Sequence, residues 1–149
     1  MEKNGKGKEY YKSGQLLFVG EYLKGKQWNG KLYSPENINI YEIKNGKGFL
    51  KKYNYWGELE FEGEYLNGER NGKGKEYKYG KLKFEGEYLN GERNGKGKEY
   101  HGNGKLKFEG EYLNGKKNRN EKEYNYDGKL IFDGKYLNGK RWSGHGKEF

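Results

Sequence analysis

An eight-residue sequence recurs along this chain at a nearly fixed step. Phe61-Glu-Gly63-Glu-Tyr65-Leu-Asn-Gly68 returns unchanged from Phe84 and Phe108, and with two substitutions from Phe132, at steps of 23, 24 and 24 residues. A period of this length is typical of repeat arrays, in which each unit packs only against its neighbours. The chain is therefore expected to form an extended surface rather than a globule built around a pocket.

The composition limits the core that such units can build. Of 149 residues, 16 are Tyr, 7 are Phe and 27 are Gly, while hydrophobic residues make up only 30%. So low a hydrophobic fraction, together with 36% charged residues, would by itself suggest disorder. Because the aromatic residues keep fixed places in each unit, we expect a folded core of rings packed against glycines.

Within one unit, residues 82–88 alternate between two chemical types, which is the pattern of a half-buried strand. One face carries Leu82, Phe84, Gly86 and Tyr88, and the other carries charged residues. Asn90-Gly91 and Asn94-Gly95 together predict a turn, and residues 96–100 predict a second strand. Each unit is thus a predicted β-hairpin. The expected core is a ladder of Phe61, Phe84, Phe108 and Phe132 beside Tyr65, Tyr88, Tyr112 and Tyr136.

The predicted fold is all-β: a single elongated, twisted antiparallel meander of stacked β-hairpin repeats. We expect about ten or eleven strands over ~50 Å, in one repeat domain spanning 1–149. Its units are a half-repeat at 1–17, a repeat at about 18–37, an irregular unit at 38–60, and repeats at 61–83, 84–107, 108–131 and 132–149. Around Pro35, the only proline, the stretch 30–57 is expected to be a degenerate or kinked hairpin.

Several classes of protein are disfavoured by what the sequence lacks. There is no cysteine for a disulfide, a thiolate nucleophile or a cysteine-based zinc site. With no 18-residue apolar run and no apolar amino-terminal stretch, a cytoplasmic location is expected, with peripheral membrane association as the alternative. The net charge of +9 is spread along the chain instead of clustered, so no nucleic-acid groove is expected.

Three segments approach the phosphate-binding pattern GxxxxGK[ST], beginning at Gly20, Gly110 and Gly134. All three lack the final hydroxyl residue and none is followed by a predicted helix, so we interpret them as products of the repeat. The only imidazoles, His101 and His145, lie about two repeats apart, which does not favour a shared metal site. No cofactor and no metal are expected.

One carboxylate per repeat forms a row: Glu62, Glu85, Glu109 and Asp133. In a meander every second strand intervenes, so neighbours in this row would stand ~10 Å apart. Lysines such as Lys96 and Lys98 are expected between them as cross-strand partners. We interpret the row as a solvated, charge-alternating face without catalytic residues, and we do not expect an enzyme.

The aromatic rows have two interpretations. The rings can form the core of a single-layer sheet, or one face can form an aromatic groove that grips a peptide or a helix. In the second case the candidate residues of a partner-binding groove are Tyr22, Tyr65, Tyr88, Tyr112 and Tyr136.

The recurrent Gly-Glu-Tyr and Asn-Gly-Lys-Gly segments at a step of 23–24 residues resemble the MORN (membrane occupation and recognition nexus) repeat. The bacterial variant, some members of which are described as antitoxin components, is the most similar. The resemblance covers nearly the whole chain and is weakest at 31–57; Asn118-Arg-Asn120 also departs from the repeated Asn-Gly pair. The resemblance implies that the chain functions as a membrane-associated tether, a protein-binding scaffold or a dimerisation module.

The function expected from these observations is that of a non-enzymatic scaffold. It would bind a protein partner, or its own copy, through a groove or through open sheet ends such as the half-repeat at 4–10 and the closing strand at 144–149. Peripheral binding to anionic, phosphoinositide-containing membranes is the alternative. An antitoxin or immunity role, implied by the resemblance alone, is a further alternative.

Overall fold

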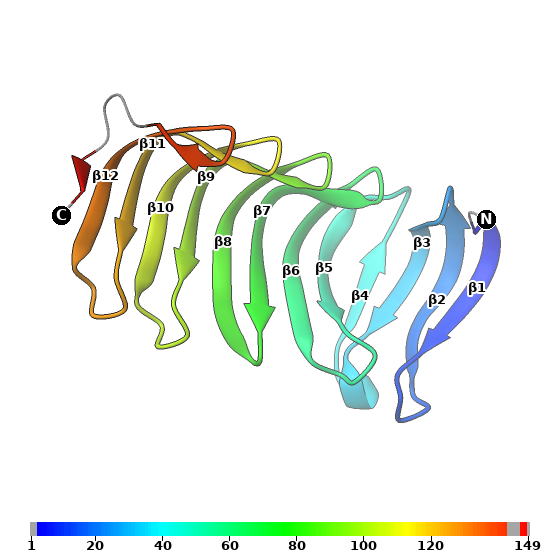
Figure 1. The fold of residues 1–149 in the computed structure, drawn as a ribbon. Coiled ribbons are helices and arrows are strands. Elements are labelled where there is room, and N and C mark those ends of the chain that lie inside the picture. The colour runs from blue at the N-terminus through cyan, green and yellow to red at the C-terminus, as the bar shows by residue number, and fades with distance from the viewer. Residues whose placement is uncertain (1–2, 143–146, 149) are drawn as a thin grey trace.

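The computed structural model describes residues 3–142 and 147–148, and these form an all-β, antiparallel array of hairpins. Successive strands lie side by side, with β1 and β12 at opposite ends of an elongated, curved array (Figure 1). The strands are β1 (Gly5–Tyr10), β2 (Leu16–Leu23), β3 (Lys26–Tyr33), β4 (Ile40–Ile43), β5 (Gly48–Tyr53), β6 (Leu59–Leu66), β7 (Glu69–Lys78), β8 (Lys81–Leu89), β9 (Glu92–Tyr100), β10 (Leu106–Leu113), β11 (Lys116–Tyr124), β12 (Leu130–Leu137), β13 (Lys140–Arg141) and β14 (Lys147–Glu148).

The predicted elongated antiparallel meander is confirmed. Its strands form two sheets, and the described residues contain fourteen strands where ten or eleven were expected. Strands β1 to β4 make a four-stranded sheet, and β5 to β13 follow in sequence order in a second sheet, where β14 also pairs with β12. The break lies in the predicted irregular stretch, after a short 3-10 turn at Pro35–Asn37. Strand β4 has no Phe-x-Gly-x-Tyr pattern, so the packing that joins regular hairpins is missing there.

Between the sheets, the turn that joins β4 to β5 continues the array. Its backbone links both neighbours, because Gly46 N donates to Trp28 O and Gly68 N donates to Gly46 O, each at 2.8 Å. The two sheets therefore stay in register at this edge although β4 and β5 share no ladder beyond the Lys44–Lys47 bridge.

Regular hairpins close through two-residue Asn-Gly turns, as the sequence predicts. In the β8–β9 turn, Asn90 has φ 50° and Gly91 has φ 87°. Positive φ at both central residues defines the type I′ turn, whose twist matches that of the flanking strands. Asparagine and glycine are the residues that adopt this conformation most readily.

The second Asn-Gly pair was predicted as part of the same turn, and this prediction is wrong. Asn94 and Gly95 lie inside β9, where Gly95 has φ 97° and the register with β8 shifts between Gly86 and Tyr88. This is a β-bulge. The bulge has a structural use, because Asn94 Oδ1 accepts a hydrogen bond at 3.2 Å from the backbone N of Asn114 in the next hairpin turn.

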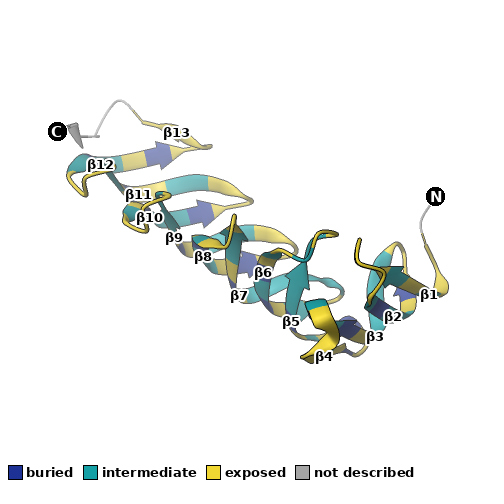
Figure 2. Ribbon diagram, turned by 90° about the horizontal axis from the view of Figure 1, so that it is seen from below, coloured by how far each residue is buried: buried dark blue, intermediate teal, exposed yellow. Residues whose placement is uncertain are grey.

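The predicted aromatic ladder is confirmed, and it forms the core. The four phenylalanines are fully or almost fully buried, and the burial colours place buried segments within the strands rather than at the turns (Figure 2). Phe84 meets Tyr88 of its own strand and Tyr112 of the next repeat, with ring centroids 5.8 and 5.4 Å apart in edge-on geometry. Such pairs add about 0.5–1.5 kcal/mol each beyond area burial.

A second cluster packs the N-terminal sheet together with β5, the first strand of the second sheet. Its buried members are Phe18, Tyr22, Leu32, Ile43 and Leu50, and Tyr65 packs against both clusters. Aliphatic residues replace rings here because the units around the break lack the regular pattern. Tyr65 is thus the ring that joins the two cores.

A layer of cations covers the ladder on its outer side, which the sequence analysis did not predict. Arg70, Arg93, Lys117 and Arg141 lie 4.0, 3.9, 3.9 and 4.5 Å from the ring centroids of Phe61, Phe84, Phe108 and Phe132. Cation–π contact and the aliphatic stems of these side chains exclude water from a single-layer sheet. The signal in the sequence is one Arg or Lys two residues after each Asn-Gly turn.

Candidate binding groove

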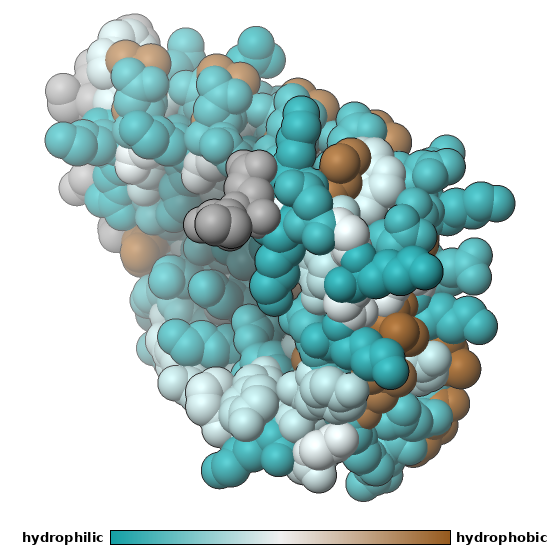
Figure 3. All heavy atoms as spheres, turned by 90° about the vertical axis from the view of Figure 1, so that its right-hand side faces the viewer, coloured by the Kyte–Doolittle hydropathy of each residue, from teal (hydrophilic) through white to brown (hydrophobic). Residues whose placement is uncertain are grey.

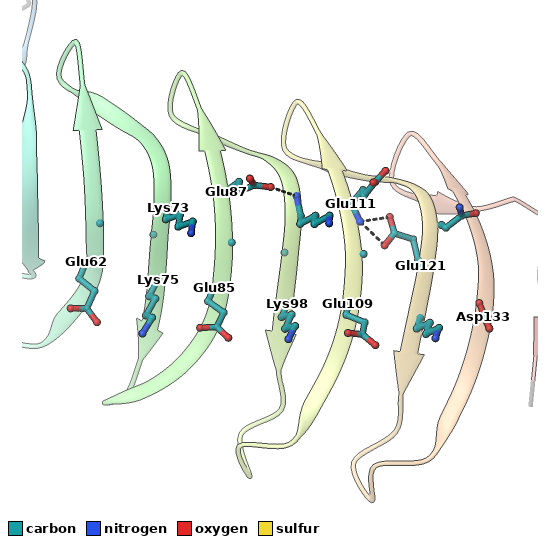
Figure 4. A pocket seen from close by; sticks show the side chains of 18 of the residues that line it. Glu62, Lys73, Lys75, Glu85, Glu87, Lys98, Glu109, Glu111, Glu121 and Asp133 are labelled. Atoms are coloured by element: carbon teal, nitrogen blue, oxygen red, sulfur yellow. Dashed lines mark hydrogen bonds between the residues drawn. The ribbon is translucent and has the colours of Figure 1, made fainter.

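A groove of about 920 Å³ runs across the strands on the face opposite the aromatic ladder. It reaches from Phe49 on β5 to Asp133 on β12. The middle of the groove is a row of glycines that lie opposite one another on successive strands, and charged residues flank this row on both sides (Figure 4). These glycines are Gly63, Gly74, Gly86, Gly97 and Gly110.

The glycines are required by the packing on the other face. A Cβ on Gly86 would stand 2.8 Å from the ring of Phe84 and 2.6 Å from the backbone O of Lys96. The close approach of ring and strand therefore leaves the backbone bare toward the groove. The requirement for glycine at these positions thus gives both the aromatic core and the floor of the groove.

Charge alternates from strand to strand along one wall of the groove. Glu85 lies opposite both Lys75 and Lys98, and Lys98 lies opposite both Glu85 and Glu109. The whole row, in spatial order, is Lys51, Glu62, Lys75, Glu85, Lys98, Glu109, Lys122 and Asp133. This confirms the predicted charge-alternating face, with Lys98 between two carboxylates as expected. The same prediction is wrong for Lys96, which lies opposite Glu111 outside this row.

The second wall is less regular. Lys73 lies opposite Glu87, and Lys96 lies opposite Glu111. Here a carboxylate also supports the bulge, because Glu87 Oε2 accepts a hydrogen bond at 2.7 Å from Lys96 N. Both walls therefore present acidic and basic groups, and neither sign dominates.

Tyrosines fix the carboxylates of the first wall. Tyr100 donates to Glu85 at 2.5 Å and Tyr124 donates to Glu109 at 2.8 Å, and Tyr77 donates to Glu62. Burial and the hydrogen bond to the glutamate together raise the pKa of each of these tyrosines to about 12. The carboxylates are therefore held as oriented acceptors.

The five tyrosines predicted to form a partner-binding groove do not line this groove. Tyr22, Tyr88, Tyr112 and Tyr136 are buried and Tyr65 is partly buried, all in the aromatic cores. Tyr136 donates to Glu123 at 2.7 Å, and its ring packs edge-on against Phe108 and Phe132. The structure thus supports the core interpretation of these rings. The groove residues were missed because glycine and alternating charge carry no binding signature by themselves.

Other chemical motifs of the sequence have structural roles. The segments beginning at Gly20, Gly110 and Gly134 each form strand and turn, so no helix receives a phosphate. His101 Nε2 lies 2.9 Å from Tyr124 O in a turn, and His145 lies outside the described residues. Within residues 3–142 and 147–148, no cluster of three His, Cys, Asp or Glu side chains could hold a metal ion, and no helix is long and apolar enough to cross a membrane.

Glu121 interrupts the glycine row of the groove. It lies opposite Gly110, and its carboxylate is almost completely buried, with 1% of its surface exposed. The carboxylate accepts hydrogen bonds from Glu111 N at 3.0 Å and Asn118 N at 3.1 Å. Burial raises its pKa to about 8 despite these two backbone donors. One end of the groove therefore differs chemically from the rest.

A row of exposed leucines follows the turn edge of the array. The leucine before each regular turn is 40–59% exposed: Leu23, Leu66, Leu89, Leu113 and Leu137. Lys26, Lys116 and Lys140 lie directly opposite three of them on the adjoining strands. The surface seen end-on is otherwise mainly hydrophilic, with hydrophobic residues in limited patches (Figure 3).

The comparisons with known proteins found no relative of this chain. No protein-family model matches the chain, and a search of curated proteins gave no match.

Proposed function

We propose that the chain is a non-enzymatic scaffold that binds an extended segment of another protein along the glycine-floored groove. The observation that carries this proposal is the groove itself, which crosses β5 to β12 between two charged walls. Shallow repeat surfaces of this kind are used for binding elongated partners. The resemblance to MORN repeats agrees with this proposal but rests on the repeat sequence alone.

The mixed charge of the walls favours a polypeptide over a nucleic acid. Glutamates alternate with lysines at the spacing of neighbouring strands, about 4.8 Å. A phosphate backbone needs cations without intervening carboxylates. A peptide that carries both Lys and Glu side chains can instead pair with both, while its backbone lies over the glycines.

The test is selection of binding peptides from a displayed random library, followed by titration of three proteins. The groove variant Glu85→Gln/Glu109→Gln removes two charges from the wall and keeps the acceptors for Tyr100 and Tyr124. The matched control is Glu60→Gln/Glu92→Gln, two exposed positions outside the groove.

Because exposed ion pairs contribute about 0.2–1 kcal/mol each, the loss of two pairs should weaken binding of the selected peptides to the groove variant by roughly twofold to thirtyfold. The control should bind like the wild type. Equal affinities for all three proteins would show that the peptides bind elsewhere and would overturn the proposal.

Self-association is a second mode of the same scaffold function. Among the described residues, β1 pairs only with β2, so one of its edges presents unpaired backbone groups. Such an edge can add a strand from another copy. Sedimentation equilibrium over a hundredfold concentration range should show a dimer, whereas a constant monomer mass would exclude this mode. Of the predicted closing strand at 144–149, only Lys147–Glu148 is described, paired with β12.

Peripheral binding to anionic lipid is the second candidate function, and the exposed leucine row beside lysines favours it. Apolar side chains can enter the headgroup region while lysines meet lipid phosphates. Sedimentation with phosphoinositide vesicles at physiological salt tests this. Leu113→Gln/Leu137→Gln, at two leucines that lie opposite lysines, should reduce binding, whereas Ile38→Gln, at an exposed position away from the row, should not. No binding by the wild type would exclude it.

A further inference from the structure

The ladder tyrosines follow one hydrogen-bonding rule with a single exception. The hydroxyl of each regular tyrosine donates to a glutamate that lies opposite a ladder phenylalanine. These pairs are Tyr22–Glu9, Tyr88–Glu76, Tyr112–Glu99 and Tyr136–Glu123. The glutamates lie opposite Phe18, Phe84, Phe108 and Phe132, respectively.

Cations complete the surroundings of these carboxylates. Glu99 accepts from Tyr112 and lies 4.0 Å from Arg93 and 3.5 Å from Lys117. Arg93 also donates to Glu76 at 2.9 Å. Although burial opposes ionisation, the hydrogen bonds from Arg93 and Tyr88 lower the pKa of Glu76. The array thus repeatedly builds a carboxylate pocket from one tyrosine hydroxyl and one or two cations.

At Tyr65 the carboxylate is missing from this arrangement. In the regular pairs the glutamate lies on the strand that precedes that of the tyrosine. On β5, which precedes the strand of Tyr65, the residue opposite Phe61 is Lys52. Glu76, which lies opposite Phe61 on β7, accepts from Tyr88. The Lys52 Nζ lies 5.2 Å from the centroid of the Tyr65 ring, and Arg70 lies 4.0 Å from the centroid of the Phe61 ring. Tyr65 therefore has a hydroxyl and two cations around it but no glutamate acceptor.

Neither cation has a counter-ion in direct contact, although Glu9 acts on Lys52 and Arg70 acts on Glu76 at longer range. Among the described residues, no carboxylate lies within 4.0 Å of Lys52 or Arg70, whereas Arg93 and Lys117 both have one. Lys52 donates instead to Gln27, which occupies the place that Arg93 has in its own repeat. Burial lowers the pKa of Lys52 to about 8. The charge of Glu9 acts in the opposite direction, and the charge of Arg70 lowers the pKa of Lys52 as burial does. Glu9 itself accepts hydrogen bonds from Tyr22 and Gln27.

We propose that Lys52, Arg70 and the Tyr65 hydroxyl form a binding site for an oxyanion, which takes the place of the missing glutamate. The ligand class is a carboxylate or a phosphate, because these present the acceptor oxygens that the repeated pockets hold. All three residues are partly exposed, so a ligand can reach them. The site lies on the aromatic face and is independent of the groove.

The anion can come from two sources, an acidic side chain of a partner or free phosphate, and the two are separated by the probe. The protein is titrated with N-acetylglutamate amide and, in a separate experiment, with inorganic phosphate, while backbone amide NMR shifts are recorded. Saturable shifts around residues 51–53, 65 and 70 are expected with at least one probe. The tighter probe identifies the source. An absence of saturable shifts with both probes would overturn the proposal.

Two variants test the assignment of the site. Lys52→Glu restores the glutamate of the repeat, so it should abolish the shifts and raise the melting temperature. Arg70→Gln should weaken binding at least about tenfold, since hydrogen bonds to charged groups are stronger than those between neutral groups.

The matched control is Lys107→Glu, which makes the same change in net charge at an exposed position on β10. Weakening by Lys107→Glu equal to that of the site variants would mean non-specific attraction and would reject the site. The groove variant Glu85→Gln/Glu109→Gln should leave anion binding unchanged, so this proposal and the groove proposal can fail separately.

Discussion

Glu121 shows how one residue can change an array of nearly identical units. In the other regular repeats the corresponding position is Gly74 or Gly97, which lie opposite Gly63 and Gly86. A glutamate there fills the space above Gly110, where a Cβ would meet the Glu121 carboxylate. Its carboxyl group accepts from Asn118 N and Glu111 N, and the Glu111 side chain lies 3.7 Å from Arg119.

The raised pKa of Glu121 predicts a pH-dependent stability. Between the ordinary value of 4.5 and the folded value of about 8, the folded state keeps a proton that the unfolded chain loses. The free energy of unfolding should therefore fall as the pH rises through this window. Between pH 5.5 and 8.5, the wild type should lose on the order of 3 kcal/mol more than Glu121→Gln.

Urea unfolding of both proteins at these two pH values measures the difference. Glu121→Gln is the control for shape, since it keeps the side-chain size without titrating. Parallel profiles for the two proteins would mean that Glu121 is ionised in the folded state across this range.

At the scale of the hairpin, a ring and a glycine on neighbouring strands act as one packing unit. Phe84 on β8 lies over Gly97 on β9, where a Cβ would stand 2.7 Å from the ring and 3.0 Å from Tyr112. The pairing of the two strands, the hairpin turn between them and the position of the ring therefore depend on one another. A hairpin without this pair loses its attachment to the next one, as β4 does.

Gly97→Ala should destabilise the protein by about 1–3 kcal/mol, because the added methyl group overpacks the ring contact. Gly102→Ala is the matched control, since a Cβ there has no atom within 4 Å and the backbone is not strained for an L residue. It should be neutral or slightly stabilising through the unfolded state. Equal unfolding midpoints in urea for the two variants would contradict the ladder as the source of stability.

For the whole molecule, the array has two cores that meet close to the break between β4 and β5, with Leu50 on β5 still part of the N-terminal core. The N-terminal cluster around Phe18 and the long ladder share only Tyr65 as a common packing partner. Because repeat units are stabilised mainly by their nearest neighbours, the two sheets should open with different free energies. Lys52 and Arg70 also lie near this junction, so the side chains next to the break depart from the pattern that the other repeats share.

Phe18→Leu should accelerate amide hydrogen exchange in β1 to β3 and leave exchange in β8 to β10 nearly unchanged. Phe84→Leu should do the reverse, since each ring is fully buried in its own core. Exchange measured residue by residue by NMR gives the opening free energies directly. Equal acceleration in both sheets by either variant would show one cooperative unit.

The sequence by itself determined the all-β fold, the hairpin unit, the aromatic ladder and the alternating charges. These follow from local period, from Asn-Gly turns that require positive φ, and from strictly repeated rings, so each unit carries its own signal. Only the tertiary structure decided that Asn94-Gly95 is a bulge, that cations cover the rings, and that the glycines form a groove floor. It also located the break in the sheet and the missing glutamate at Lys52. These features depend on register between strands, which fixes the neighbours of a side chain, and no single repeat encodes that register.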